Sequence, residues 1–243
     1  MLLLHLDEEI DFDILRRGFF RWAPDTQENY LKNYFKRWMH IDEDFLVEVI
    51  ESCDLKVKAL AAEYFLETAS SYAAPTLRTF LSRNDDMYLQ NYAIRYFLIT
   101  GFEGKAEAER IFNERLKSSD ERVIFANLAL IRQLFDEKYL DYVRTMLNDP
   151  RRSVVIDASG TLALIYQPRD KDEPEIMRFV GELMERGGYH ELKASAVILG
   201  KKKGEKERDL LIRLLDTNCA PLKSLIINIL SENYPKDFVV YFK

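Results

Sequence analysis

Three acidic clusters hold the side chains that could perform acid–base or cation chemistry. They lie at residues 7–13, 42–44 and 170–175. Paired carboxylates can exchange protons or bind cations. Each cluster, however, comes directly before a predicted helix, where the positive end of the helix dipole favours acids without any catalytic role. We therefore interpret all three clusters as helix-start signals and predict no catalytic residue in them.

Histidine and cysteine are too sparse to suggest a metal site. His5, His40 and His190 are never four residues apart, and Cys53 and Cys219 are the only cysteines. Zinc and iron sites need closely spaced ligand pairs, and a disulfide framework needs more cysteines. We expect reduced thiols, no metal and no cofactor.

The glycines do not form a phosphate-binding loop. The pairs at 101–104 and 187–188 follow no predicted strand and precede no Lys-Ser or Lys-Thr, so we predict helix C-caps there. Ser159-Gly160 is expected inside a helix and not on a nucleophile elbow.

One N-terminal stretch combines cations with aromatic rings, as nucleic-acid-binding surfaces do. It contains Arg16, Arg17, Arg21, Trp22, Lys32, Lys36, Arg37 and Trp38. Residues 1–41 nevertheless carry a net charge of −1, and the whole chain carries −6. Because nucleic-acid-binding domains are usually basic, we favour a capping helix pair whose rings form a core.

Composition favours an all-helical chain. Only 9 Gly and 7 Pro occur in 243 residues, fewer than the many turns of a β-sandwich or barrel require. No apolar run approaches the length of a membrane span, and the apolar start at residues 1–6 lacks the basic region of a signal peptide. We expect a cytoplasmic protein.

An internal repeat of about 33 residues runs along most of the chain. Its windows begin at Val57, Leu89, Val123, Val154, Leu192 and Leu222, with a small or apolar residue four positions later at Ala61, Ala93, Ala158, Ala196 and Ile226, while Asn127 breaks the pattern. Residues four apart share a helix face, and small side chains there let a neighbouring helix approach. An amphipathic segment precedes each window, at 45–53, 74–81, 106–116, 139–147, 176–184 and 210–215.

The repeat resembles the HEAT-like family of helical repeats. The resemblance is carried by Asp149-Pro150 followed by Val154, Ala158 and Leu162, by the run from Leu192 to Gly200, and by Val57-Lys58. It implies an all-α, right-handed α-α superhelix of about seven antiparallel helix pairs. We predict one domain over 1–243, with a capping pair at 1–41, six repeats at 42–233 and an apolar tail at 234–243.

Charge differs between the two helices of each predicted pair. The six first segments with their turns carry −10, and the second helices carry +4, or +1 without Lys201–Lys203, which follow an expected cap at Gly200. In HEAT-like proteins the second helix tends to line the concave face. The resemblance therefore implies a partner-binding groove lined by Asn91, Arg95, Arg122, Asn127, Arg132, Arg152, Asp157 and Lys193.

These patterns predict a non-enzymatic module that binds another protein of acidic or mixed surface charge. An inhibitor or immunity protein of a toxin, or an assembly adaptor, would fit. The alternative is a nucleic-acid-binding protein or an enzyme similar to the HEAT-like DNA glycosylases, in which Trp22 and Trp38 would hold a nucleotide and Asp157 would assist chemistry. A third possibility is a scaffold that self-associates through the tail Phe238–Phe242.

Overall fold

The computed structural model describes residues 12–37, 42–83, 86–168 and 173–235. These residues form fourteen α-helices and one 3-10 helix, with no strand among them, so the all-α prediction is confirmed. None of the described helices has the length and apolar character to cross a membrane. The chain divides into two compact units, 1–118 and 119–243, which we describe separately.

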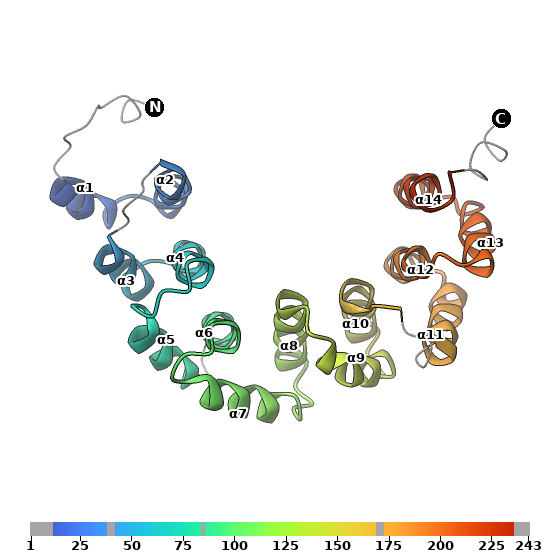
Figure 1. The fold of residues 1–243 in the computed structure, drawn as a ribbon, viewed down its shortest axis with the longest axis horizontal. Helices are drawn as coiled ribbons and strands as arrows, with labels where there is room; N and C mark the ends of the chain where they lie inside the picture. The colour runs from blue at the N-terminus through green and yellow to red at the C-terminus, as the bar shows by residue number, and fades with distance from the viewer. Residues whose placement is uncertain (1–11, 38–41, 84–85, 169–172, 236–243) are drawn as a thin grey trace. The chain divides into compact units, whose positions relative to one another are not determined.

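The first unit contains α1 to α7. They span Phe12–Phe19, Pro24–Arg37, Glu43–Ser52, Leu55–Glu67, Ala74–Leu81, Met87–Thr100 and Lys105–Arg115. The second helices of the pairs, α2, α4 and α6, contact one another in series, and so do the first helices α3, α5 and α7 (Figure 1). Contacts between α3 and α4 and between α5 and α6 join the two rows.

The second unit contains α8 to α14. They span Glu121–Leu134, Leu140–Leu147, Arg152–Ile165, Glu173–Arg186, Tyr189–Lys202, Glu205–Leu214 and Ala220–Asn233, with the 3-10 helix Glu137–Tyr139 before α9. The even-numbered helices again contact one another in series, and α9, α11 and α13 pack against them. We call α8, α10, α12 and α14 the second-helix row of this unit. The HEAT-like stacking of helix pairs is thus confirmed.

The repeat residues occupy the positions that the spacing predicted. Ala61, Ala93, Ala158 and Ala196, which belong to α4, α6, α10 and α12, have no exposed surface. Asn127, which breaks the pattern, is equally buried in α8. Because small side chains allow close helix approach, these positions hold neighbouring second helices together.

Acidic residues cap several helices, as the turn sequences predicted. The side chain of Asp54 accepts a hydrogen bond from the Val57 N–H at 3.1 Å, and Asp120 accepts one from Arg122 N–H at 2.8 Å. Each bond satisfies a backbone donor that the first helical turn leaves free. Gly101 ends α6 with φ 73°, as expected of a glycine C-cap.

Gly200 requires a correction, because it does not end a helix. α12 continues to Lys202, and Lys203 takes the left-handed conformation at the C-cap with φ 55°. An ideal Cβ at Gly200 would lie 2.6 Å from Cγ2 of Ile229 in α14. The glycine therefore allows close packing between two second helices rather than a reversal of the chain.

The aromatic rings near the N-terminus pack against one another. The Phe19 ring is buried, with its centroid 5.0 Å from Phe45 of α3, 5.8 Å from Trp22 and 5.7 Å from Tyr30. Burial raises the pKa of Tyr30 to about 12. Among the cations of this stretch, Arg16 pairs with Glu48 at 2.8 Å. The predicted aromatic core is present between α1, α2 and α3, while Trp38 lies outside the described residues.

The boundary between the units falls between α7 and α8, inside the predicted repeat that consists of the segment 106–116 and the window beginning at Val123. The prediction of one continuous domain stays a prediction, as does the handedness of the superhelix. Residues 1–11, which contain most of the first acidic cluster, and the tail residues 236–243 lie outside the described residues.

Candidate interaction surface

Exposed hydrophobic side chains gather on the second helices. Seven large hydrophobic residues are exposed in the described part of the chain, namely Leu55, Tyr72, Tyr88, Ile99, Phe135, Leu164 and Tyr189. All except Tyr72 belong to a second helix or, in the case of Phe135, to its C-cap. The two helix rows therefore differ in the apolar surface that they expose to solvent.

Formal charge also differs between the rows of each unit. In the first unit, α1, α3, α5 and α7 carry −2, whereas α2, α4 and α6 carry +2. In the second unit, the first helices with the 3-10 helix carry −2 and the second-helix row carries +3. The difference has the sign that the sequence predicted, although it is smaller without the connecting turns.

The exposed side of α10 is a narrow stripe that we call the open stripe: Ser153, Ile156, Asp157, Gly160 and Leu164. Spacings of three and four residues place these positions on one face of the helix. The other positions of α10 are buried, except for the exposed Arg152 at its first residue, and the helix packs on α8, α9 and α12.

Gly160 is the empty position of this stripe. It is exposed, and an ideal Cβ would meet no atom within 4 Å. Ile156 and Leu164 lie one turn before and after it, and Leu164 is 47% exposed. Two apolar side chains therefore flank a helix position that has no side chain and no neighbouring atom above it, and we call this position the notch.

The α8 side of the open stripe is closed by a polar cluster. Arg132 Nη1 donates to Asp157 Oδ1 at 2.8 Å and to Thr161 Oγ1 at 2.9 Å. The Arg132 and Asp157 side chains are each 28% exposed. Because the carboxylate already has a cationic partner, Asp157 adds little negative charge to this surface.

On the α12 side, Arg152 binds Glu191. Its Nε and Nη2 donate to Glu191 Oε1 at 3.3 and 3.2 Å. The arginine side chain is 70% exposed, whereas that of Glu191 is 1% exposed. The buried carboxylate thus holds one edge of an exposed guanidinium in a fixed position. Lys193, two residues further along α12, is exposed.

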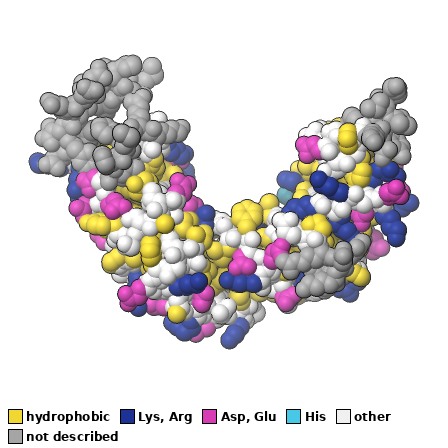
Figure 2. Space-filling model, viewed as in Figure 1, with side chains coloured by type: hydrophobic (Ala, Val, Ile, Leu, Met, Phe, Trp, Pro, Cys, Tyr) yellow, Lys and Arg dark blue, Asp and Glu magenta, His cyan; other side chains and the backbone are white. Residues whose placement is uncertain are grey.

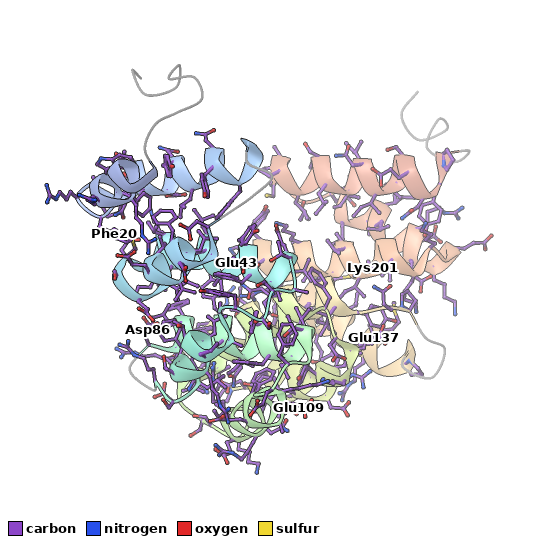
Figure 3. All side chains as sticks on the ribbon, turned by 60° about the vertical axis from the view of Figure 1, so that its left-hand side comes forward. Phe20, Glu43, Asp86, Glu109, Glu137 and Lys201 are labelled. Carbon is purple, nitrogen blue, oxygen red and sulfur yellow. The ribbon has the colours of Figure 1, made fainter. Side chains whose placement is uncertain are left out.

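Lys201 and Lys202 at the end of α12 bind groups of neighbouring elements of the fold. Lys201 Nζ donates to the carbonyls of Leu164 and Tyr166 at 2.8 and 2.9 Å, and burial lowers its pKa (Figure 3). A cation at the C-terminal carbonyls of α10 is stabilised by the helix dipole. Lys202 Nζ lies 3.2 Å from Glu207 in a pair whose side chains are 7% and 8% exposed. These two cations therefore belong to the helix packing and add little to the outer surface.

In the first unit, α6 exposes its own mixed surface. Tyr88 is 63% and Ile99 is 52% exposed, and Tyr92 is half-buried between them. Arg95, on the same helix, forms an ion pair with Glu63 of α4. The charges of this pair compensate each other, so the α6 surface is mainly aromatic and aliphatic.

The predicted groove residues fall into three groups. Asn91 and Asn127 are buried, so the expectation that they line an exposed groove is corrected; Asn127 Nδ2 instead lies 3.4 Å from the hydroxyl of Tyr142. Arg95, Arg132, Arg152 and Asp157 are bound to side chains on neighbouring second helices. Arg122 and Lys193 are exposed. The partner-binding role of the accessible residues stays a prediction.

Sequence reasoning missed Ile156, Gly160 and Leu164 as surface residues. It considered Gly160 only as part of a nucleophile elbow, and the structure confirms its place inside a helix. A signal was present, because the three residues recur every four positions on a face that the buried Val154, Ala158 and Leu162 do not share.

The described residues contain no group of three or more possible metal ligands. Both cysteines are free thiols, and burial raises the pKa of Cys53 to about 11, which disfavours a reactive thiolate. Trp22, a residue of the nucleotide-binding alternative, has its ring 5.5 Å from that of Tyr30.

Comparisons with known proteins give a likeness of fold. No family model and no curated protein sequence matches the chain. Among solved structures, it is similar to a chain in the structure of the complex of CpcE and CpcF of phycocyanin lyase from Nostoc sp.. The match covers 80% of this chain and 78% of that chain, with 16% identity and a TM-score of 0.49. At this identity and score, the likeness carries no argument about function.

Proposed function

We propose that the protein is a non-enzymatic interaction module that binds a partner protein through its second helices. The observation that carries this proposal is the distribution of the large exposed hydrophobic side chains, because six of the seven in the described residues lie on second helices or at the C-cap of one. Exposed apolar side chains that recur on one row of helices offer a partner protein several points of contact. The positive charge of the same helices adds a preference for an acidic or mixed partner.

A cytoplasmic inhibitor or immunity protein of a toxin is the specific role that we propose within this class. Such a protein acts by covering a surface of its target and needs no catalytic group. An extended row of helices supplies a large area for this purpose.

The test is affinity purification of the tagged full chain from its native host at low salt, with quantitative mass spectrometry. We expect a stoichiometric partner that is lost from Tyr88→Glu and Leu164→Glu variants. Asn113→Glu in α7 and Arg213→Glu in α13 are matched controls, since both positions are exposed on first helices. Absence of a stoichiometric partner, or equal loss in the controls, would refute the proposal.

A further inference from the structure

We propose that the open stripe of α10 accepts an acidic segment of a partner protein, with one apolar side chain over Gly160 and carboxylates at Arg152 and Lys193. The inference rests on the proposed function and names the chemistry of the partner. It concerns the second unit alone, where α10 contacts both α8 and α12.

The notch at Gly160 is not required by the packing of this chain. Glycine inside a helix costs about 1 kcal/mol relative to alanine, and here no neighbouring atom explains it. Gly200 in α12 differs, because Ile229 occupies the space that a side chain would need. An exposed glycine between two apolar residues leaves room for a side chain from outside the chain.

The dimensions of the notch suit one apolar side chain. Ile156 and Leu164 are eight residues apart, which corresponds to about 12 Å along a helix. Their exposed atoms can contact an inserted side chain from both ends, while the Gly160 backbone forms the floor. Such contacts stabilise a complex by removing apolar surface from water.

The charges around the notch favour a negatively charged segment. The exposed charged residues of the second-helix row are Arg122, Lys193, Glu232 in the last turn of α14, and Arg152, which is paired with the buried Glu191. The partly exposed acids of α8 and α10 already have partners, because Asp157 is paired with Arg132 and Glu121 accepts a hydrogen bond from Ser153. Dark blue side chains lie close to the cyan histidine on this part of the surface (Figure 2). Charge complementarity therefore selects a partner rich in Asp and Glu.

Arg152 is prepared for such a contact. Its Nε and Nη2 are bound to the buried carboxylate of Glu191, while 70% of its side-chain surface remains accessible. A guanidinium held in this way loses less conformational entropy when a carboxylate binds to its free edge.

A protein segment fits these observations better than a nucleic acid. Nucleic-acid affinity depends on many cation–phosphate contacts, whereas this surface offers three exposed cations and the whole chain carries −6. The apolar notch also matches a side chain more closely than a phosphate backbone. Nucleic acid is therefore an outcome of the test and not the occupant that we propose.

The binding test uses the full chain and fluorescent twelve-residue peptides in anisotropy titrations at about 50 mM salt, where charge interactions are weakly screened. The main probe contains Asp and Glu with a single central Leu. A second peptide has Ser in place of Leu, a third has Lys in place of the acids, and a twelve-base single-stranded DNA is the fourth probe. We expect measurable binding of the first peptide and at least fivefold weaker binding of every other probe.

Two substitutions locate the site. Gly160→Gln fills the notch with a polar side chain and should weaken binding of the main probe at least tenfold. Gly181→Gln is its matched control, because Gly181 is an exposed glycine in α11 whose ideal Cβ also meets no atom within 4 Å. Lys193→Glu should weaken binding about fivefold, whereas Lys206→Glu on the exposed surface of α13 should not change it.

The two proposals fail in distinguishable ways. No binding of the main probe, tighter binding of the DNA, or equal effects of the Gly160 and Gly181 variants would overturn the inference about the open stripe. If the purified native partner is still bound by Gly160→Gln and Lys193→Glu, the protein-binding function stands while this inference is wrong.

Discussion

Gly160 and Gly200 occupy interior positions of two neighbouring helices, and their surroundings are opposite. A Cβ at Gly200 would lie 2.6 Å from Ile229, whereas a Cβ at Gly160 would contact nothing. The same residue type thus allows close helix packing at one site and leaves an unfilled surface position at the other. Of these two glycines, only Gly200 is required by the packing of neighbouring helices.

The largest effect should come from the buried charge pair at the packed end of α12. Lys202→Met removes the partner of Glu207, which remains buried, and should lower the free energy of unfolding by about 3 kcal/mol. Urea denaturation followed by circular dichroism measures the change. The control is Lys193→Met, which changes an exposed lysine of the same helix. A similar loss of unfolding free energy in this control would contradict the distinction between the buried Lys202 and the exposed Lys193.

Alanine at Gly200 should give the next largest effect. The new Cβ must displace Ile229, so we expect a loss of about 1–2 kcal/mol in the free energy of unfolding. A double variant tests this cause. In an Ile229→Ala background, Gly200→Ala should lower the free energy of unfolding only slightly. A full cost that persists in this background would show that the contact with Ile229 is not the cause.

Alanine at Gly160 should instead stabilise the protein. Since nothing opposes the methyl group, Gly160→Ala should raise the free energy of unfolding by about 0.5–1 kcal/mol through helix propensity. Gly181→Ala should do the same in α11. Thermal denaturation of both variants measures these changes in stability. If only Gly160→Ala were destabilising, Gly160 would have a packing role that the structure does not show.

The smallest effect on stability is expected for Lys193→Glu. Its side chain is exposed, so the free energy of unfolding should change by less than about 0.5 kcal/mol. A larger loss in urea denaturation would mean that reduced peptide binding by this variant reports on folding rather than on recognition.

The helix pairs could be predicted from sequence because their signals are local. Four repeat windows have an alanine four residues after the opening aliphatic residue, at Ala61, Ala93, Ala158 and Ala196. Close approach of neighbouring helices requires small side chains at those points. Helix caps such as Asp54 and Asp120 could be predicted for the same reason, since each accepts a hydrogen bond from a backbone N–H within three residues of its own position. Local patterns are therefore sufficient for the fold class.

The surface could be predicted only in part, because its details depend on neighbouring repeats. Arg132 pairs with a residue 25 positions away, Arg95 with one 32 away and Arg152 with one 39 away. No pattern within one repeat shows which of these cations has a partner. Asn127 was predicted to line the groove because it is a polar residue of a second helix, whereas the structure buries it.

The serial contacts of the second-helix row have a consequence for folding. Each helix of the row packs on helices that lie one or two elements away along the chain, so native contacts form without very long loop closures, and such chains fold fast for their size. α10 is held by α8, α9 and α12, whereas among the described helices α14 packs on α12 and α13. We therefore expect the backbone amides of α14 to exchange with solvent deuterium before those of α10.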